Sequence, residues 1–263
     1  MAEHTTVTLR VRDTAITLRR AGGGRALLVL HGASDCGIWF PWLDNLAASH
    51  DVMLPEHPGF GSSDTPPWLD TIADLANFNL DLLDDLAIAS LDLVGFDLGG
   101  WIAAELAVRN GARLSSLTLV GAAGLHVEGV AQVDPFLGSD EERMRDLFHQ
   151  QECATAFLQR VLDPVREDTR LKNETTAARL TWAPRGHDPH LRKWLHRIKA
   201  PTLVIWGAHD RLYPKEHALA YGKLIPGAKV AIIPDCGHLP HIEQPDAFAA
   251  AFKSFLDAMR IAA

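Results

Sequence analysis

The stretch L-V-G-F-D-L-G-G-W, residues 93–101, places an acid in the middle of a glycine frame. Asp97 lies between Gly95 and Gly99, directly after a short apolar run and before a helical pattern. A sharp turn from strand to helix needs small neighbours, and the helix directs its free N–H groups and positive dipole end at the turn. Such a turn exposes its central side chain, so the pattern predicts that Asp97 is a nucleophile. The alternative is an ordinary acid in a tight turn.

Two later residues supply the partners that a nucleophile needs. Asp210 ends the stretch T-L-V-I-W-G-A-H-D, and His238 lies in I-P-D-C-G-H-L-P-H. A carboxylate fixes the tautomer of an imidazole and stabilises its protonated form, so the pair can act as a base. The sequence therefore predicts the catalytic set Asp97, Asp210 and His238. His241 is an alternative base, which we expect instead at the start of the last helix, and Cys236 is expected to be a buried small hydrophobe.

The elements that must position these residues alternate between strand and helix. Alternating or continuous apolar runs predict strands at 6–12, 15–20, 26–30, 51–54, 91–96, 114–120, 202–206 and 229–233, the first two as a hairpin. Helical patterns cover 71–88, with Thr71 as the cap, and 98–110, 214–224 and 245–259. This order predicts an α/β fold with a mostly parallel, doubly wound sheet, and the carboxyl ends of its strands gather His31, Asp97, Asp210 and His238 at one edge.

One long segment interrupts the alternation. Residues 126–197 contain helical patterns and prolines but no β-like run. We therefore predict a core made of residues 1–125 and 198–263, with residues 126–197 as a helical cap over the end of the sheet.

Composition excludes several classes of function. The chain has 263 residues, 47% of them hydrophobic, and a net charge of −8, so a nucleic-acid partner is not expected. No apolar run reaches the ~18 residues of a membrane span, and the start M-A-E-H-T-T-V-T-L-R lacks the features of a signal peptide, so we expect no membrane partner and a cytoplasmic location. The three cysteines match no zinc or redox pattern, and H-D-P-H at 187–190 is expected to be a solvated loop. We expect no cofactor, no metal ion, and a monomer or homodimer.

The motifs together resemble those of the α/β-hydrolase superfamily. H-G-A-S-D, H-P-G-F-G-S-S-D, the turn at Asp97, W-G-A-H-D and C-G-H-L-P-H occur in the order expected for that family. The resemblance implies that the backbone N–H groups of Ala33 and Leu98 form an oxyanion hole. It also implies that the insertion is the family's cap, which lines the substrate pocket.

An aspartate at the nucleophile position resembles the dehalogenase and epoxide hydrolase branches, but their accessory residues are missing. Leu98 follows the nucleophile where haloalkane dehalogenases have Trp and haloacetate dehalogenases have Arg, and residues 126–197 hold no tyrosine. Side chains that could contact the substrate instead are His31, Ser34, Trp39, His149, Trp182, Trp194 and Tyr213.

These features predict a hydrolase for a small, mostly apolar molecule. A carboxylate nucleophile favours displacement at saturated carbon, through an ester of Asp97 that water hydrolyses with His238 as base. The residues around Asp97 resemble those of esterases, lactonases and carbon–carbon bond hydrolases, so Asp97 as a replaced serine is one alternative. A ligand-binding member without turnover is another.

Overall fold

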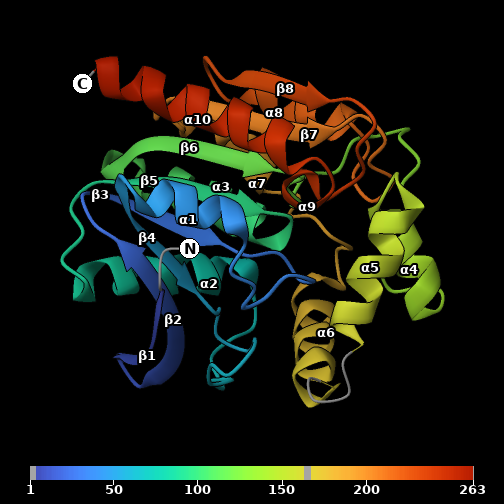
Figure 1. The fold of residues 1–263 in the computed structure, drawn as a ribbon, viewed down its shortest axis with the longest axis horizontal. Coiled ribbons are helices and arrows are strands. Elements are labelled where there is room, and N and C mark those ends of the chain that lie inside the picture. Colours follow the sequence, from blue (N-terminus) through green and yellow to red (C-terminus); the bar gives the residue numbers. More distant parts are fainter. Residues whose placement is uncertain (1–3, 163–166, 263) are drawn as a thin grey trace.

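An eight-stranded sheet forms the centre of the computed structural model, which describes residues 4–162 and 167–262 (Figure 1). Its strands are β1 (Thr5–Val11), β2 (Thr14–Gly22), β3 (Arg25–Leu30), β4 (His50–Pro55), β5 (Leu91–Phe96), β6 (Leu114–Val120), β7 (Thr202–Gly207) and β8 (Lys229–Ile233). They follow the spatial order β1-β2-β4-β3-β5-β6-β7-β8. β2 pairs antiparallel with β1 and β4, and every later pairing is parallel. The predicted hairpin and the mostly parallel sheet are confirmed.

Helices cover both faces of this sheet. They are α1 (Pro41–Ala47), α2 (Ile72–Asp85), α3 (Leu98–Asn110), α8 (Glu216–Leu224), α9 (Pro240–Glu243) and α10 (Pro245–Ala262), with a 3₁₀ turn η1 (Gly111–Arg113). In Figure 1, α1 and α10 lie on the near face, and α2, α3 and α8 lie on the far face. The central strands β3, β5, β6 and β7 are therefore buried on both sides, which explains their continuous apolar runs.

Local sequence explains where α2 begins and ends. The Thr71 hydroxyl accepts the N–H of Asp74, and the Asp74 carboxylate accepts the N–H of Thr71, which satisfies free donors at the helix start. The helix stops at Asp85, earlier than the predicted 88, because Ala87 adopts a left-handed conformation with φ of 53°. The short helix α1 was not predicted; its main signal is Pro41 at the first helical position.

Within the described residues, the regular elements of the segment between β6 and β7 are helices joined by turns and loops. They are α4 (Asp140–Leu147), α5 (Gln151–Val161), α6 (Glu167–Thr181), α7 (Leu191–Trp194) and the 3₁₀ turn η3 (Leu195–Arg197). Figure 1 shows α4, α5 and α6 beside the carboxyl ends of the parallel strands. α6 is fixed to the loop after β4, since Asn173 Oδ1 accepts the Gly61 N–H at 2.8 Å and the Thr176 hydroxyl donates to Gly59 O at 2.8 Å.

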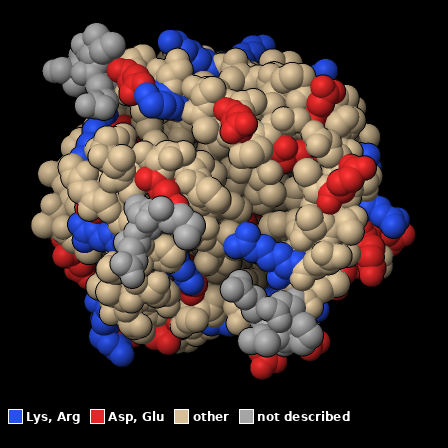
Figure 2. Space-filling view, in the orientation of Figure 1, with Lys and Arg blue, Asp and Glu red and all other residues tan. Residues whose placement is uncertain are grey.

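Two further observations concern the surface. Basic and acidic side chains are interspersed over the coloured part of the face in Figure 2, so no broad region of it carries one sign of charge. Within residues 4–162 and 167–262, no helix combines the length and apolar character needed to cross a bilayer.

Candidate active site

The turn between β5 and α3 holds Asp97 in a strained conformation. Its φ is 48° and its ψ is −115°, a backbone that side chains other than glycine adopt rarely. The flanking glycines make the turn possible: a Cβ on Gly95 would lie 2.2 Å from Gly99 O, and one on Gly99 would lie 2.2 Å from Leu30 O. The predicted glycine frame therefore has a steric basis.

Replacing Gly95 by alanine is expected to destabilise the protein by about 2–4 kcal/mol, because the clashing atom is backbone and cannot rotate away. Gly111→Ala is the matched control, since Gly111 has a φ of −68° and a Cβ there would meet nothing within 4 Å. The control is expected to be neutral or to stabilise by up to ~1 kcal/mol. Denaturant unfolding of both variants measures the difference, and equal stabilities would contradict the steric argument.

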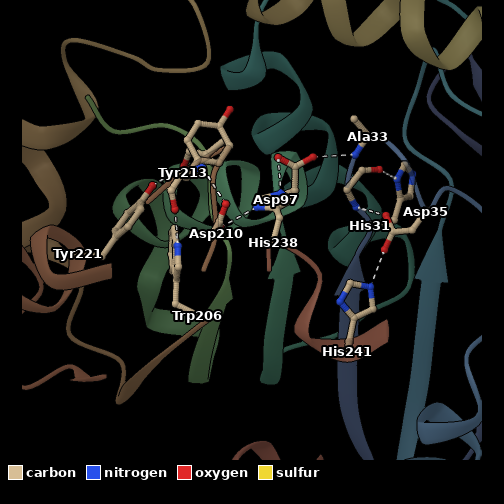
Figure 3. Close-up of polar contacts among 12 residues, drawn as sticks. His31, Ala33, Asp35, Asp97, Trp206, Asp210, Tyr213, Tyr221, His238 and His241 are labelled. Atoms are coloured by element: carbon tan, nitrogen blue, oxygen red, sulfur yellow. Dashed lines mark hydrogen bonds and ion pairs between the residues drawn. The ribbon is translucent and has the colours of Figure 1, made fainter. Parts of the chain in front are cut away.

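The two oxygens of Asp97 have different partners. Oδ2 accepts the backbone N–H of Ala33 at 3.0 Å, and Oδ1 lies 3.5 Å from Nε2 of His238 (Figure 3). The second distance is an ion-pair contact and is too long for a well-formed hydrogen bond. Leu98 is the first residue of α3, so its N–H also has no acceptor within the helix. The turn thus brings an ionisable oxygen, an imidazole and backbone N–H donors to one point.

His238 is held from its other ring nitrogen by Asp210. Nδ1 of His238 lies 2.8 Å from Oδ2 of Asp210, whose Oδ1 accepts the Tyr213 N–H at 2.9 Å. The His238 side chain is 1% exposed and that of Asp210 is fully buried. The backbone N–H of His238 donates to Leu147 O at 2.8 Å, which ties this loop to the end of α4. These contacts fix the ring with Nε2 directed at Asp97.

Two carboxylates control the charge of His238. Burial lowers its pKa, but Asp210 and, to a smaller extent, Asp97 outweigh burial and raise the pKa to about 10. A pKa of about 10 keeps His238 protonated at neutral pH. Loss of the Asp97 contribution is expected to lower the pKa of His238.

The dependence of the His238 pKa on Asp97 can be measured directly. In Asp97→Asn the His238 pKa is expected to fall below the value of about 10 in the unmodified protein, because one of two neighbouring negative charges is gone. NMR titration of the imidazole ring measures it, with the ring becoming neutral at a lower pH in the variant. An unchanged midpoint would contradict coupling between His238 and Asp97.

A second buried acid–histidine pair supports the loop of Ala33. Asp35 Oδ1 accepts the Gly32 N–H at 2.6 Å, and Oδ2 lies 3.1 Å from Nε2 of His241. Burial raises the pKa of Asp35, but His241 and Gly32 outweigh burial, so the pKa lies below its ordinary value. His241 lies in α9 just before α10, near its predicted place, and it contacts Asp35 rather than Asp97. The sequence analysis missed this pair, although Asp35 ends the H-G-A-S-D motif.

A pocket of about 200 Å³ opens onto Asp97 and His238. The strand-end loops contribute Ser34, Leu98, Leu212, Tyr213 and Leu239, and the helical segment between β6 and β7 contributes Phe136, Met144, Leu147 and Val161. Charged side chains of the same helical segment, among them Arg143, Asp146, Arg160, Arg170 and Glu174, also line the pocket, and Tyr213 adds a phenol. Burial and then the charges of Asp97 and Asp210 raise the pKa of Tyr213 well above its ordinary value, so its hydroxyl stays protonated.

Four of the residues predicted to contact a substrate do not line this pocket. His31 lies behind the Gly32 loop, where its Nε2 accepts the His57 N–H at 3.1 Å. Trp39 donates to Asp44 at 2.9 Å, and the ring of His149 stacks on that of His209. Trp182 is 55% exposed, beneath the Arg185 guanidinium. Trp194, which we also considered, is 49% exposed and does not line the pocket. Each of these side chains has its contacts or exposure away from the pocket lining, so a contact with substrate stays a prediction for them.

The cysteines are not activated. Cys236 is fully buried, as predicted, and burial raises the pKa of its thiol. Cys36 lines the pocket, but burial and the nearby acids Glu56 and Asp35 raise its pKa well above the ordinary value. Both thiols are therefore less readily ionised than a free cysteine, which disfavours thiolate chemistry at these positions.

Comparisons with known proteins agree with this architecture. The family model described as alpha/beta hydrolase fold matches residues 25–245. The chain is 30% identical over 267 residues to a 2-hydroxy-6-oxo-6-phenylhexa-2,4-dienoate hydrolase of Burkholderia cepacia, with 92% of this chain and 91% of that protein covered. A solved structure of the hydrolase of the same name from Rhodococcus sp. strain RHA1 superposes with a TM-score of 0.79 at 20% identity, over 98% of this chain and 100% of that one.

Another relative is longer than this chain. The dihydrolipoyllysine-residue acetyltransferase component of the acetoin cleaving system of Cupriavidus necator is 30% identical over 250 residues. The match covers 90% of this chain, but the chain spans only 65% of that relative's length.

Proposed function

The chain belongs to the α/β-hydrolase family and is a hydrolase, and we propose that it acts by displacement at saturated carbon through a covalent ester of Asp97. Asp210 and His238 complete the catalytic set. The substrate is a small, mostly apolar halide or epoxide.

In the first step, Oδ1 of Asp97 attacks the carbon that bears the leaving group. A carbon–oxygen bond forms, and the carbon–halogen or carbon–oxygen bond of the substrate breaks, with the electron pair staying on the departing atom. The enzyme then carries a neutral ester at Asp97. A carboxylate suits this step because it attacks saturated carbon without a base.

In the second step, water hydrolyses the ester. Esterification removes the negative charge of Asp97, which lowers the pKa of His238, so Nε2 becomes available to take a proton from water. The hydroxide attacks Cγ of Asp97, and the Ala33 and Leu98 N–H groups stabilise the oxyanion on Oδ2. The alcohol leaves with the proton from His238, and Asp97 is restored. A halide and water thus give an alcohol and a hydrogen halide, and an epoxide and water give a diol.

One observation carries the proposal: Oδ2 of Asp97 already accepts the Ala33 N–H at 3.0 Å. In carbonyl hydrolysis this donor must bind the oxygen of the substrate, whereas here it binds the second oxygen of the nucleophile. The arrangement supports a reaction in which the tetrahedral carbon is Cγ of Asp97 itself.

Tyr213 is proposed to hydrogen-bond the leaving group, because it is the phenol that lines the pocket and its hydroxyl stays protonated. Tyr213→Phe is expected to lower kcat about 10²-fold on epoxides, whose oxygen needs a proton. Tyr221→Phe is the matched control, since that hydroxyl is buried and donates to Ala123 O outside the pocket. Steady-state kinetics with both variants measures the effect, and equal rates would remove Tyr213 from the reaction.

We also propose that residues 126–197 act as the cap. Phe136, Met144, Leu147 and Val161 of this segment provide apolar side chains that line the pocket.

The proposal is tested by the source of the product oxygen. In a single turnover in H₂¹⁸O, the alcohol is expected to contain ¹⁶O, and the label is expected on the peptide that contains Asp97. Label in the alcohol on the first turnover would mean direct attack by water and would overturn the proposal. No turnover of any halide or epoxide offered would do the same.

A second candidate is hydrolysis of a carbon–carbon bond or an ester. It is favoured by the name of the Burkholderia cepacia relative and by the length of the match, 92% of this chain. In that case Asp97 occupies a site shaped for serine.

A further inference from the structure

Three side chains that can ligate a metal meet on the outer side of the active-site loops. They are His149, between α4 and α5, His209, after β7, and Asp235, after β8. One ligand atom from each lies within 4.8 Å of the others. The two imidazole rings stack with their centroids 4.0 Å apart and their planes at 12°. We propose that this cluster is a binding site for a divalent transition-metal ion such as Zn²⁺.

The backbone around each ligand is fixed by contacts between the three segments. The N–H of His209 donates to Cys236 O at 2.8 Å, and the side chain of Gln150 donates to Asp235 O at 3.3 Å. Gln244 donates to the same carbonyl at 3.1 Å, and Asp235 adopts a left-handed backbone with φ of 49°. The backbone that carries His209 and Asp235 is therefore held by the framework.

The ligand atoms are available. Within the part of the chain that the structure describes, neither imidazole nor the Asp235 carboxylate takes part in a hydrogen bond or ion pair, although the rings contact each other. His209 and Asp235 are exposed and His149 is half-buried, so an ion can enter from solvent.

The donor set fits a metal of intermediate softness. Two imidazoles and one carboxylate bind Zn²⁺, Co²⁺ or Ni²⁺ well and leave other positions to water. A tetrahedral ion with bonds of about 2.0–2.1 Å needs ligand atoms about 3.4 Å apart. Rotation of the side chains must therefore bring the ligand atoms roughly 1 Å closer together. The two ring planes are nearly parallel, so the rings must also rotate before a nitrogen of each points at the same ion.

The proposed metal site lies next to the loops that carry Asp210 and His238. His209 directly precedes Asp210, and Asp235 lies three residues before His238. His149 follows the end of α4, whose Leu147 O binds the His238 N–H. A bound ion would join the two loops of the acid–histidine pair to the helical segment.

Calorimetric titration of the full chain, first treated with EDTA, tests the proposal with Zn²⁺ alone. We expect one Zn²⁺ per chain and a rise in Tm of about 5 °C at saturation. His149→Ala and His209→Ala are each expected to lower the affinity ~10-fold or more. His190→Ala is the matched control, because His190 is exposed, lies near an acid, and is outside the cluster; it is expected to bind as the unmodified protein does.

Further measurements separate this site from other ligands. Asp97→Asn is expected to bind Zn²⁺ unchanged, because Asp97 and His238 are not the ligands. With Co²⁺ in place of Zn²⁺, the absorption spectrum is expected to lack a thiolate charge-transfer band. Absence of stoichiometric binding, full affinity in both histidine variants, or a thiolate band would each overturn the proposal. The Tm of each variant in EDTA shows whether it is folded.

Discussion

Replacing His238 by glutamine is expected to stop turnover and to leave a stable ester on Asp97. The intact protein would gain the mass of the alkyl group, or of the whole epoxide, and the mass change would map to the peptide that contains Asp97. We expect kcat to fall about 10³-fold or more, as happens when an essential base is removed.

The ester is expected to accumulate because the two steps of the reaction need different groups. Attack on saturated carbon needs only the Asp97 carboxylate, whereas hydrolysis of the ester needs a base near Cγ. His238 is the only histidine among the described residues that line the pocket, and its Nε2 lies 3.5 Å from Asp97. Glutamine fills similar space without accepting the proton at neutral pH, so the ester accumulates.

Two controls make the result specific. His190→Gln changes an exposed histidine away from the pocket and is expected to turn over normally with no lasting adduct. His238→Gln combined with Asp97→Asn is expected to form no adduct at all. If unmodified protein turns over halides or epoxides and His238→Gln never accumulates an ester, the covalent mechanism is wrong.

The fold could be predicted from the sequence because its strands are apolar for a physical reason. Strands between two helical layers must be buried on both faces, so their runs are continuous, and all eight strands lie close to their predicted places. Helix ends followed local signals such as the Thr71 cap. The short α1 has only Pro41 as a local signal. The long α6 is charged along much of its length and is held by side-chain contacts to the loop at residues 59–63.

The residues that meet at the strand ends could be anticipated, since the carboxyl ends of parallel strands share one edge. Side chains that depend on loops could not. Trp39, His149 and Trp182 have the chemistry of hydrogen-bond donors, but their direction depends on contacts with Asp44, His209 and Arg185 that no local pattern encodes. The Asp35–His241 pair likewise joins residues far apart in the chain.

Replacing Asp97 by serine is expected to exchange one chemistry for the other. Serine has a single oxygen, so the Ala33 N–H that now binds Oδ2 becomes free to bind a substrate carbonyl. His238 loses a neighbouring charge, its pKa falls, and Nε2 can activate the hydroxyl. We expect turnover of halides and epoxides to drop about 10³-fold or more, and hydrolysis of an activated aryl ester to appear with an acyl group on Ser at position 97.

Asp97→Ala is the matched control, because it also frees the Ala33 N–H but supplies no nucleophile. The serine variant is expected to hydrolyse the ester faster than the alanine variant does under the same conditions. The acylation burst measures the concentration of active sites. If the unmodified protein already hydrolyses the ester faster than the serine variant does, Asp97 serves carbonyl chemistry itself. If instead the serine variant gains nothing while Asp97 turns over halides or epoxides, the pocket is built around the carboxylate, and the likeness to carbon–carbon bond hydrolases is one of fold and not of reaction.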